Sequence, residues 1–271
     1  MQKTLYISDL DGTLLDSEQH VSEYSCKIIN SLVERGMLFS YATARSVHTA
    51  KKAADGLSAK IPLIVYNGAF IINNQTLERI ASNTFAEEES NKIYSSLVSG
   101  GIYPIVYSLI DGIEKFSYVT STLSTGLSDF IDTRKGDFRN RPLNNESGIL
   151  DGEKFYFTCI DAKEKLAPVY NSLKDKFNCF FQTDIYSGEY WLEIMPAAAT
   201  KANAIFQLKD IMKCDRVVSF GDALNDIPMA EISDEFYAVG NAADKIKEIA
   251  TGIIGTNDND GVAKWLLKNY R

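Results

Sequence analysis

The stretch TLYISDLDGT (residues 4–13) is the most informative part of the sequence for the fold. Residues 4–8 form a short apolar run with the length of a buried strand. Two carboxylates, Asp9 and Asp11, follow at once, and Gly12 lets the backbone turn sharply there. Ligands of open α/β sheets bind beyond the carboxyl ends of strands, so both side chains would project into such a site. Two solvated acids in an ordinary turn are the alternative interpretation.

The segments that follow this stretch alternate between strand-like and helix-like patterns. Ser22 is placed to cap a helix with apolar residues at helical spacing, and Gly36 is placed to end it. The last third of the chain repeats the pattern, with Thr200 as a second N-cap. Alternation with short connections predicts a parallel sheet flanked by helices, that is, an α/β fold. The expected strands are 4–8, 37–43, 62–68, 216–222 and 236–240, and the expected helices are 22–36, 46–56, 201–212, 226–231, 242–250 and 261–270.

The middle of the chain, roughly residues 80–190, has a different pattern. Short β-rich runs flank or follow two helical stretches, which predicts an α+β insertion into the parallel-sheet domain. Its aromatic side chains could line a substrate pocket, although packing between strands is the favoured interpretation. These aromatic residues are Tyr103, Tyr107, Phe155, Tyr156, Phe157 and Tyr186.

Composition narrows the class of protein. The chain has 271 residues and a formal net charge of −8, with 45% hydrophobic and 24% charged residues. Surfaces that bind nucleic acids need clustered Lys and Arg. Because the net charge of this chain is negative, no nucleic-acid partner is expected. The four cysteines are scattered without a CxxC pair, which favours free thiols over a zinc or redox site. No signal peptide and no run of ~20 apolar residues is visible, so we expect a cytoplasmic protein without a membrane partner.

Two further stretches carry polar groups at a strand end or a helix start. Thr43 and Ala44 follow the second strand, where a hydroxyl and backbone N–H groups can bind a small anion. An ordinary helix cap is the alternative. Lys201 stands at a helix N-terminus, where the helix dipole disfavours a cation unless an anion lies between them. An exposed lysine is the alternative there.

The last stretch is GDALND (residues 221–226), which follows the strand-like RVVSF. Its acids, Asp222 and Asp226, suit a hard cation such as Mg²⁺, and Asn225 can bond a phosphate or a water. An Asp-rich turn that caps the next helix is the alternative. One parallel sheet would bring all four stretches to the same edge, and this convergence favours a functional site over independent turns.

In this order, the stretches resemble the motifs of the haloacid dehalogenase superfamily, specifically its Cof-type phosphatases. The matching motifs are DLDGT (residues 9–13), Thr43, NGA (residues 67–69), LEIMP (residues 192–196), Lys201 and GDxxND (residues 221–226). The resemblance spans nearly the whole chain. It implies a Rossmann-like core formed by residues 1–80 and 191–271, an inserted α+β cap of the C2 type at residues 81–190, and dependence on Mg²⁺.

The resemblance also implies a role for each matching residue. Asp9 would attack phosphorus, and Asp11 would protonate the leaving oxygen and then activate water. Mg²⁺ would be held by an Asp9 carboxylate oxygen, the Asp11 main-chain carbonyl and Asp222, with Asp226 nearby. The phosphate would be bound by Thr43, Ala44, Lys201 and Asn225. Family branches that preserve the aspartyl-phosphate carry Thr at the position of Asp11, so the acid here predicts turnover of a small phosphorylated metabolite.

The sequence departs from the family pattern at three loops without losing a chemical group. It has Ala44, Ala202 and Ala223-Leu224 where the family often has glycine or Gly-Glu. We expect these differences to affect the geometry of the loops and the fit of the substrate. A phosphomutase and a non-catalytic sensor of phosphorylated ligands are the competing interpretations, and Arg45 could reach substrate or form a salt bridge. Sugar phosphates and other phosphorylated metabolites remain open as substrates, and a monomer or a homodimer is expected.

Overall fold

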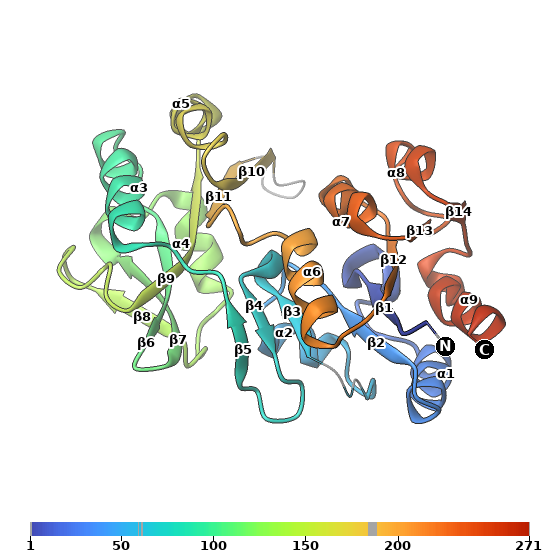
Figure 1. The fold of residues 1–271 in the computed structure, drawn as a ribbon. Helices are drawn as coiled ribbons and strands as arrows, with labels where there is room; N and C mark the ends of the chain where they lie inside the picture. The colour runs from blue at the N-terminus through green and yellow to red at the C-terminus, as the bar shows by residue number, and fades with distance from the viewer. Residues whose placement is uncertain (1, 59, 61, 184–188, 271) are drawn as a thin grey trace. The chain divides into compact units, whose positions relative to one another are not determined.

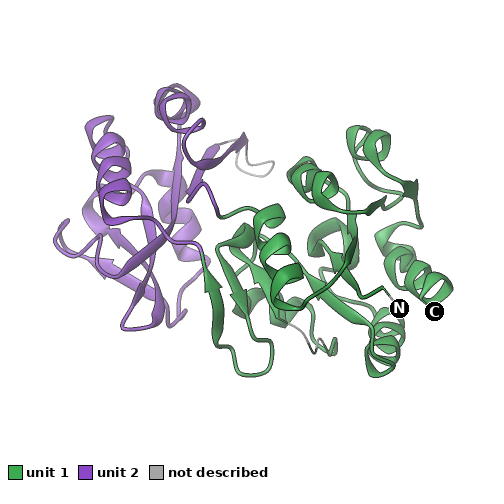
Figure 2. Cartoon of the chain, in the orientation of Figure 1, with its two compact units in different colours: residues 1–82, 199–271 green, residues 83–198 purple. Residues whose placement is uncertain are grey.

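The computed structural model describes residues 2–58, 60, 62–183 and 189–270. They form two compact units, which are described separately below (Figures 1 and 2). The first unit consists of residues 1–82 and 199–271, and the second consists of residues 83–198. The chain therefore leaves the first unit once and returns to it, as the predicted insertion requires.

A five-stranded parallel sheet forms the centre of the first unit, in the order β14–β13–β12–β1–β2. Both neighbours of β1 run parallel to it, and its Leu5 and Ile7 are fully buried. Burial on both faces is the normal state of a parallel sheet covered by helices, and it explains the continuous apolar runs in the sequence. The strands are β1 (Thr4–Ser8), β2 (Leu38–Tyr41), β12 (Arg216–Gly221), β13 (Glu235–Ala238) and β14 (Gly252–Ile253).

The helices of the first unit begin where the sequence predicts. The Ser22 hydroxyl accepts a hydrogen bond from the Ser25 N–H, and the Thr200 hydroxyl accepts one from the Asn203 N–H, so both predicted N-caps are confirmed. The helices are α1 (Glu23–Glu34), α2 (Val47–Ala53), α6 (Lys201–Ile211), α7 (Ile227–Ile232), α8 (Asp244–Ile249) and α9 (Gly261–Asn269). Short helical turns are η1 (Leu10–Leu14), η2 (Tyr66–Gly68), η4 (Leu224–Asp226) and η5 (Asn257–Asn259).

The third predicted strand does not join the parallel sheet as a full member. β3 (Leu63–Val65) pairs with β4 (Phe70–Ile72), and β4 pairs with β5 (Arg79–Ser82), in a separate antiparallel sheet. A single parallel bridge between Ala42 and Ile64 links it to the end of β2. The backbone reverses over η2, where three successive residues have positive φ. β4 therefore pairs with β3 and occupies hydrogen bonds of β3 that a parallel strand would otherwise need.

The second unit is an α+β structure, as predicted. Its six strands lie in the order β10–β11–β9–β6–β7–β8, all antiparallel except for β7 and β8. Apolar residues of two helices, including Ile93 and Leu166, share a core with Val106, Phe157 and Leu192 of the sheet. The elements are β6 (Ile105–Ile110), β7 (Ile113–Val119), β8 (Asn140–Leu143), β9 (Glu153–Asp161), β10 (Asn178–Thr183), β11 (Tyr190–Met195), α3 (Glu87–Ser99), α4 (Thr125–Asp132), α5 (Lys163–Leu173) and the turn η3 (Thr120–Thr122).

The return to the first unit comes at residue 199, later than the predicted residue 191. The reason is β11, which is hydrogen-bonded between β10 and β9 and contributes Leu192 and Ile194 to the core of the second unit. The run YWLEIM was correctly predicted as a strand, but its alternating pattern does not say which sheet it joins.

The aromatic residues of the second unit mostly pack within it. Phe155 and Phe157 are fully buried, and Tyr107 and Tyr156 are less than a tenth exposed, which confirms the strand-packing interpretation for these four. Tyr186 lies outside the described residues.

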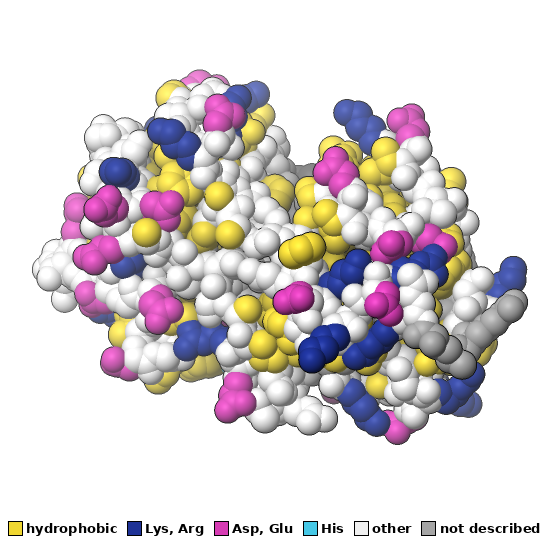
Figure 3. Space-filling model, viewed as in Figure 1, with side chains coloured by type: hydrophobic (Ala, Val, Ile, Leu, Met, Phe, Trp, Pro, Cys, Tyr) yellow, Lys and Arg dark blue, Asp and Glu magenta, His cyan; other side chains and the backbone are white. Residues whose placement is uncertain are grey.

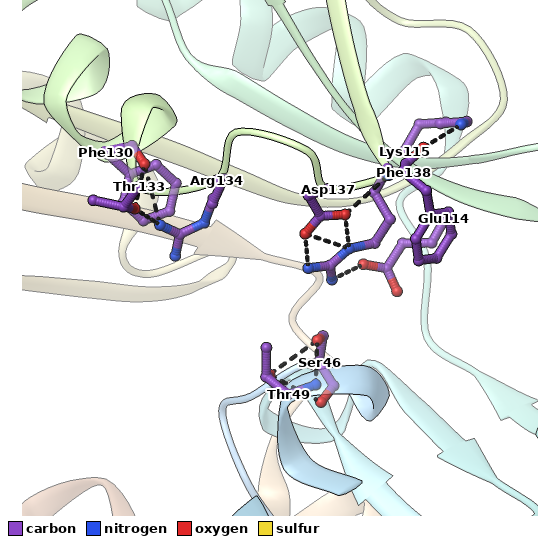
Figure 4. Close-up of polar contacts among 10 residues, drawn as sticks. Ser46, Thr49, Glu114, Lys115, Phe130, Thr133, Arg134, Asp137 and Phe138 are labelled. Atoms are coloured by element: carbon purple, nitrogen blue, oxygen red, sulfur yellow. Dashed lines mark hydrogen bonds and ion pairs between the residues drawn. The ribbon is translucent and has the colours of Figure 1, made fainter. Parts of the chain in front are cut away.

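A buried ionic cluster holds the segment after α4 against β7 (Figure 4). Arg139 donates to Glu114 and to Asp137, at 2.6 Å each. Its guanidinium lies 5.9 Å from the Phe116 ring centroid. Because the Arg139 guanidinium has two carboxylate partners, the free-energy cost of removing its charge from water is compensated.

The surface shows mixed charge on the face in view in Figure 3, where basic and acidic side chains are interspersed over each unit. Among the described residues, no helix is both long and apolar enough to cross a membrane.

Candidate active site

The candidate site is built at the carboxyl end of the parallel sheet in the first unit. Asp9 follows β1, and its N–H donates to the Phe220 carbonyl of β12 at 2.9 Å, which extends the strand pairing by one residue. The Asp9 side chain is buried, with only 6% of the residue exposed. A carboxylate with so little access to water requires a partner inside the protein.

Lys201 is that partner, at the first position of α6. Its Nζ donates to Asp9 Oδ1 at 2.5 Å and to Asp226 Oδ1 at 2.7 Å, and all three side chains are buried. The alternative of an exposed lysine is therefore wrong. The two carboxylates counter the positive end of the α6 dipole, which explains how a lysine is tolerated at this position.

The electrostatics of this group are set by burial and by like charges. Burial raises the pKa of Asp9 well above its ordinary range, and the nearby Asp226 carboxylate acts in the same direction while Lys201 opposes it. Burial acts to lower the pKa of Lys201, but Asp9 and Asp226 outweigh it, so the net pKa is raised and the ammonium stays charged. One lysine faces two carboxylates, so the group carries an excess of negative charge when both are ionised, and this excess is relieved by a proton or by a bound cation.

Three further hydrogen bonds fix the acidic loop after β12. Asp226 Oδ2 accepts hydrogen bonds from the N–H groups of Asp222 and Ala223, at 3.0 and 3.2 Å. Asp222 Oδ1 accepts one from the Thr13 hydroxyl at 2.9 Å. Burial raises the pKa of Asp222 to about 6, although the Thr13 hydrogen bond opposes the shift. These bonds turn both acidic side chains toward Asp9.

The donor set fits a hard divalent cation. Asp9, Asp222 and Asp226 each offer a carboxylate oxygen, and these oxygens all lie within 4.8 Å of one another. Oxygen ligands with excess negative charge are what Mg²⁺ prefers. Gly12 lies against this cluster with a φ of +75°, and a Cβ there would lie 2.5 Å from Asp222 Oδ2. A glycine is therefore required both for the turn and for the approach of Asp222.

The other acid of the first motif points elsewhere. Asp11 is paired with Arg45, whose Nη2 lies 2.5 Å from Asp11 Oδ1 and whose Nε lies 3.0 Å from Oδ2. Arg45 also donates to Gln19. Of the two roles considered for Arg45, the structure shows the salt bridge. The Asp11 side chain remains nearly half exposed, so it has access to solvent that Asp9 lacks.

The predicted phosphate-binding residues surround the ends of β2 and β12. Thr43 is fully buried, and its hydroxyl accepts a hydrogen bond from the Arg45 N–H at 3.1 Å, which leaves the hydroxyl proton available. Ala44 is exposed, and Asn225 is half-buried on η4. The loop that carries Thr43 is held by Asn67, whose N–H donates to the Thr43 carbonyl at 2.9 Å.

Sequence reasoning gave no role to three residues that shape this site. Thr13 belongs to the first motif and orients Asp222. Gly68 lies against Thr200, with a φ of +100° and with its would-be Cβ 2.2 Å from the Thr200 carbonyl oxygen. Asn241 donates to the Gly12 carbonyl at 2.7 Å. Asn241 follows β13, so the rule that ligand sites lie at strand ends would have pointed to it.

The sheet order and the carboxylates at its edge are those of an α/β enzyme whose site lies beyond the strand ends. A model of the haloacid dehalogenase-like hydrolases matches residues 6–266. The chain therefore belongs to the haloacid dehalogenase-like hydrolases, as its motifs predicted, and it is a phosphatase of this family.

Two curated relatives come from Bacillus subtilis. The 5-amino-6-(5-phospho-D-ribitylamino)uracil phosphatase YwtE is 31% identical over 278 residues, which cover 95% of each chain. The phosphatase YitU, with the same substrate in its name, is 26% identical, over 97% of this chain and 95% of its own.

Two solved structures share the fold. A haloacid dehalogenase-like hydrolase from Bacteroides thetaiotaomicron has a TM-score of 0.79 and 23% identity, with 99% of this chain and all of that chain covered. A protein from Thermotoga maritima has a TM-score of 0.77 and 23% identity, with 100% and 98% covered.

Proposed function

We propose that the chain hydrolyses a small phosphorylated metabolite in the presence of Mg²⁺, through an aspartyl-phosphate on Asp9. The observation that carries the proposal is the buried group of Lys201 with Asp9 and Asp226, which lie 2.5 and 2.7 Å from its Nζ, together with Asp222. When its carboxylates are ionised, such a group is suited to bind an additional cation that balances their charge, and it lies where a phosphate would approach the end of β1.

In this proposal, Mg²⁺ is held by carboxylate oxygens of Asp9 and Asp222 and by the Asp11 main-chain carbonyl, with Asp226 nearby. When bound, Mg²⁺ neutralises phosphate charge that would otherwise repel the attacking carboxylate. Lys201 and Thr43 bind phosphoryl oxygens through the ammonium and the hydroxyl proton. The Ala44 N–H and Asn225 complete the phosphate contacts.

The chemical steps assign one carboxylate to each role. Asp9 forms a bond to phosphorus as the ester P–O bond breaks, and Asp11 gives its proton to the leaving oxygen. Asp11 then takes a proton from a water as that water attacks the aspartyl-phosphate, which releases phosphate and restores Asp9. The exposure of Asp11 suits this role, because its proton must exchange with the leaving group and with water, and in this proposal the ion pair with Arg45 opens when Asp11 carries that proton.

The test is phosphate release from a panel of phosphorylated metabolites, with Mg²⁺ and with EDTA, beside an Asp9→Asn variant. Because YwtE is named for it, 5-amino-6-(5-phospho-D-ribitylamino)uracil is the first compound, followed by sugar phosphates. We expect release that depends on Mg²⁺ and is lost in Asp9→Asn. An isomerised sugar phosphate without free phosphate would indicate a mutase. Binding without any product would indicate a sensor.

Two further expectations belong to this proposal. The protein works in the cytoplasm, which fractionation of the host cells tests. It is a monomer or a homodimer without a nucleic-acid partner, which light scattering of the purified protein and a nucleic-acid retention assay test.

A further inference from the structure

A second layer of polar side chains lies behind the first motif of the core unit. Three residues from the C-terminal part of the chain contact the segment that follows Asp11. We call Asn241, Asn257 and Asp258 the loop brace. The Asn241 Nδ2 donates to the Gly12 carbonyl at 2.7 Å, and the Asn257 Nδ2 donates to the Leu15 carbonyl at 3.0 Å.

Two residues of the loop brace are also hydrogen-bonded to each other. The Asn257 N–H donates to Asn241 Oδ1 at 3.0 Å, which assigns the orientation of the Asn241 amide: one end accepts from η5 and the other donates to the motif loop. Asp258 accepts hydrogen bonds from both the N–H and the hydroxyl of Ser17, at 2.8 Å each. Residues 12–17 are thus held at three points by side chains that no sequence motif singled out.

The segment that is held needs external support. Residues Leu10–Leu14 form a single π-helical turn, and inside it Asp11 and Gly12 have non-helical backbone angles. Such a turn lacks the regular bonds that would fix the direction of each carbonyl. The side-chain amide of Asn241 supplies a fixed donor at Gly12, and it therefore sets the plane of the peptide between Gly12 and Thr13.

The same short loop after β13 also reaches the second acidic motif. The Ala243 N–H donates to the Asp222 carbonyl at 2.9 Å. Asp222 in turn accepts from Thr13 at 2.9 Å. One loop, residues 241–243, therefore positions both segments that carry the proposed Mg²⁺ ligands.

We propose that Asn241 is a positioning residue for the Mg²⁺ site, which it supports by fixing the Gly12–Thr13 peptide relative to Asp222. The inference rests on the proposed function for the identity of the metal. Partners that orient ligands in this way typically contribute about 10–100-fold to metal affinity or activity. Asn241 is exposed, so its removal costs little packing, and a loss of affinity would report on the hydrogen bond.

The test is a calorimetric titration of purified, EDTA-treated protein with Mg²⁺, followed by kcat and KM on the best substrate. In Asn241→Ala we expect Mg²⁺ affinity to fall by about tenfold or more and kcat to fall with it, at a nearly unchanged KM for substrate. Asn241→Asp keeps the size and the acceptor for Asn257 but loses the donor. Its added negative charge would by itself favour Mg²⁺, so weaker binding in this variant too would identify the donor as the cause.

The matched control is Asn30→Ala. Asn30 lies on α1 and makes the same two kinds of bond to a loop without proposed site residues. Its Nδ2 donates to the Gly56 carbonyl at 2.9 Å, and its Oδ1 accepts from the Ser58 N–H at 2.8 Å. It should shift the melting temperature without changing Mg²⁺ affinity.

Wild-type Mg²⁺ affinity and kcat in Asn241→Ala, or an equal loss of affinity in Asn30→Ala, would overturn the inference. A wild-type protein that binds Mg²⁺ but releases no phosphate would refute the proposed function alone, and the titration of the variants would still decide the role of Asn241.

Discussion

At the residue scale, the two aspartates of the first motif differ in environment although only one residue separates them. Asp9 is buried against Lys201, whereas Asp11 is nearly half exposed and paired with Arg45. The strand geometry explains the difference, because residues at i and i+2 would share a face only if the strand continued. Here β1 ends at Ser8 and Asp11 already lies in η1.

The proposed division of labour predicts a specific defect in Asp11→Asn. The substitution keeps the main-chain carbonyl and the size of the side chain but removes the proton donor and acceptor. Because Asp11 acts in both steps, we expect slower labelling of Asp9 and steady turnover slowed by roughly 10²–10⁴-fold. Rapid-quench kinetics with a ³²P-labelled substrate measures both rates, and Asp9→Asn, which should give no labelling, is the control. Unchanged steady turnover in Asp11→Asn would show that another group transfers the proton.

At the scale of elements, the contact between η2 and the start of α6 positions Lys201. Gly68 approaches the Thr200 backbone so closely that a Cβ would overlap its carbonyl oxygen. Gly36 has the same φ of +100°, but the nearest atom to its would-be Cβ is 4.0 Å away. A substitution at Gly36 therefore introduces backbone strain alone, whereas a substitution at Gly68 introduces both backbone strain and steric overlap.

We accordingly predict different results for Gly36→Ala and Gly68→Ala. Gly36→Ala should lower the free energy of unfolding by about 1–2 kcal/mol, the usual cost of a left-handed conformation, and leave kcat unchanged. Gly68→Ala should lower it further and also reduce kcat, because α6 must move away and carries Lys201 with it. Urea unfolding and phosphate release measure the two effects. Equal losses of stability with wild-type kcat in both variants would mean that the Gly68 contact does not position Lys201.

In the second unit, Glu193 of β11 gives a prediction about pH. Burial raises the pKa of Glu193, and a hydrogen bond with Tyr156 opposes the shift. A carboxyl whose pKa is higher in the folded than in the unfolded state favours folding while it is protonated. That contribution is complete below the unfolded pKa and is lost as the pH rises through the folded one.

Glu193→Gln should remove this dependence. We expect the stability of the variant relative to wild type to increase as the pH rises from about 4 toward neutrality, since the unfolded pKa of Glu is about 4.3. Urea unfolding followed by the fluorescence of Trp191 and Trp265 at several pH values measures the difference. A difference that is constant across this range would show that Glu193 titrates equally in both states.

At the scale of the whole molecule, the two units have separate hydrophobic cores, and all the proposed Mg²⁺ ligands belong to the first. A ligand stabilises only the structure that binds it, by about 2.7 kcal/mol at a concentration of 100 times Kd. We predict that Mg²⁺ slows amide hydrogen exchange in β1 and β12 of the first unit but leaves β6 and β9 of the second unchanged. Equal protection in both units would show that they open as one cooperative body.

Much of this protein follows from its sequence alone, because the signals involved are local. Apolar runs of strand length predicted β1, β2, β12 and β13, and Ser22 and Thr200 marked two helix starts that depend only on neighbouring N–H groups. The order of short motifs identified the family. The rule that ligands bind at strand ends placed Asp9, Asp222 and Asp226 at one edge of the sheet, and Lys201 was singled out by its position at a helix N-terminus. The structure gathers these four side chains there.

Other features were decided only by tertiary structure, because they depend on contacts between residues far apart in the chain. The sheets that β3 and β11 join depend on which strand offers free hydrogen bonds, and no pattern within either strand reveals that. The pairing of Asp11 with Arg45 joins residues 34 positions apart, and the bond from Asn241 to Gly12 joins residues 229 apart. An isolated asparagine carries no periodicity, so its role becomes visible only when the fold brings it within hydrogen-bonding distance of a turn that needs a donor.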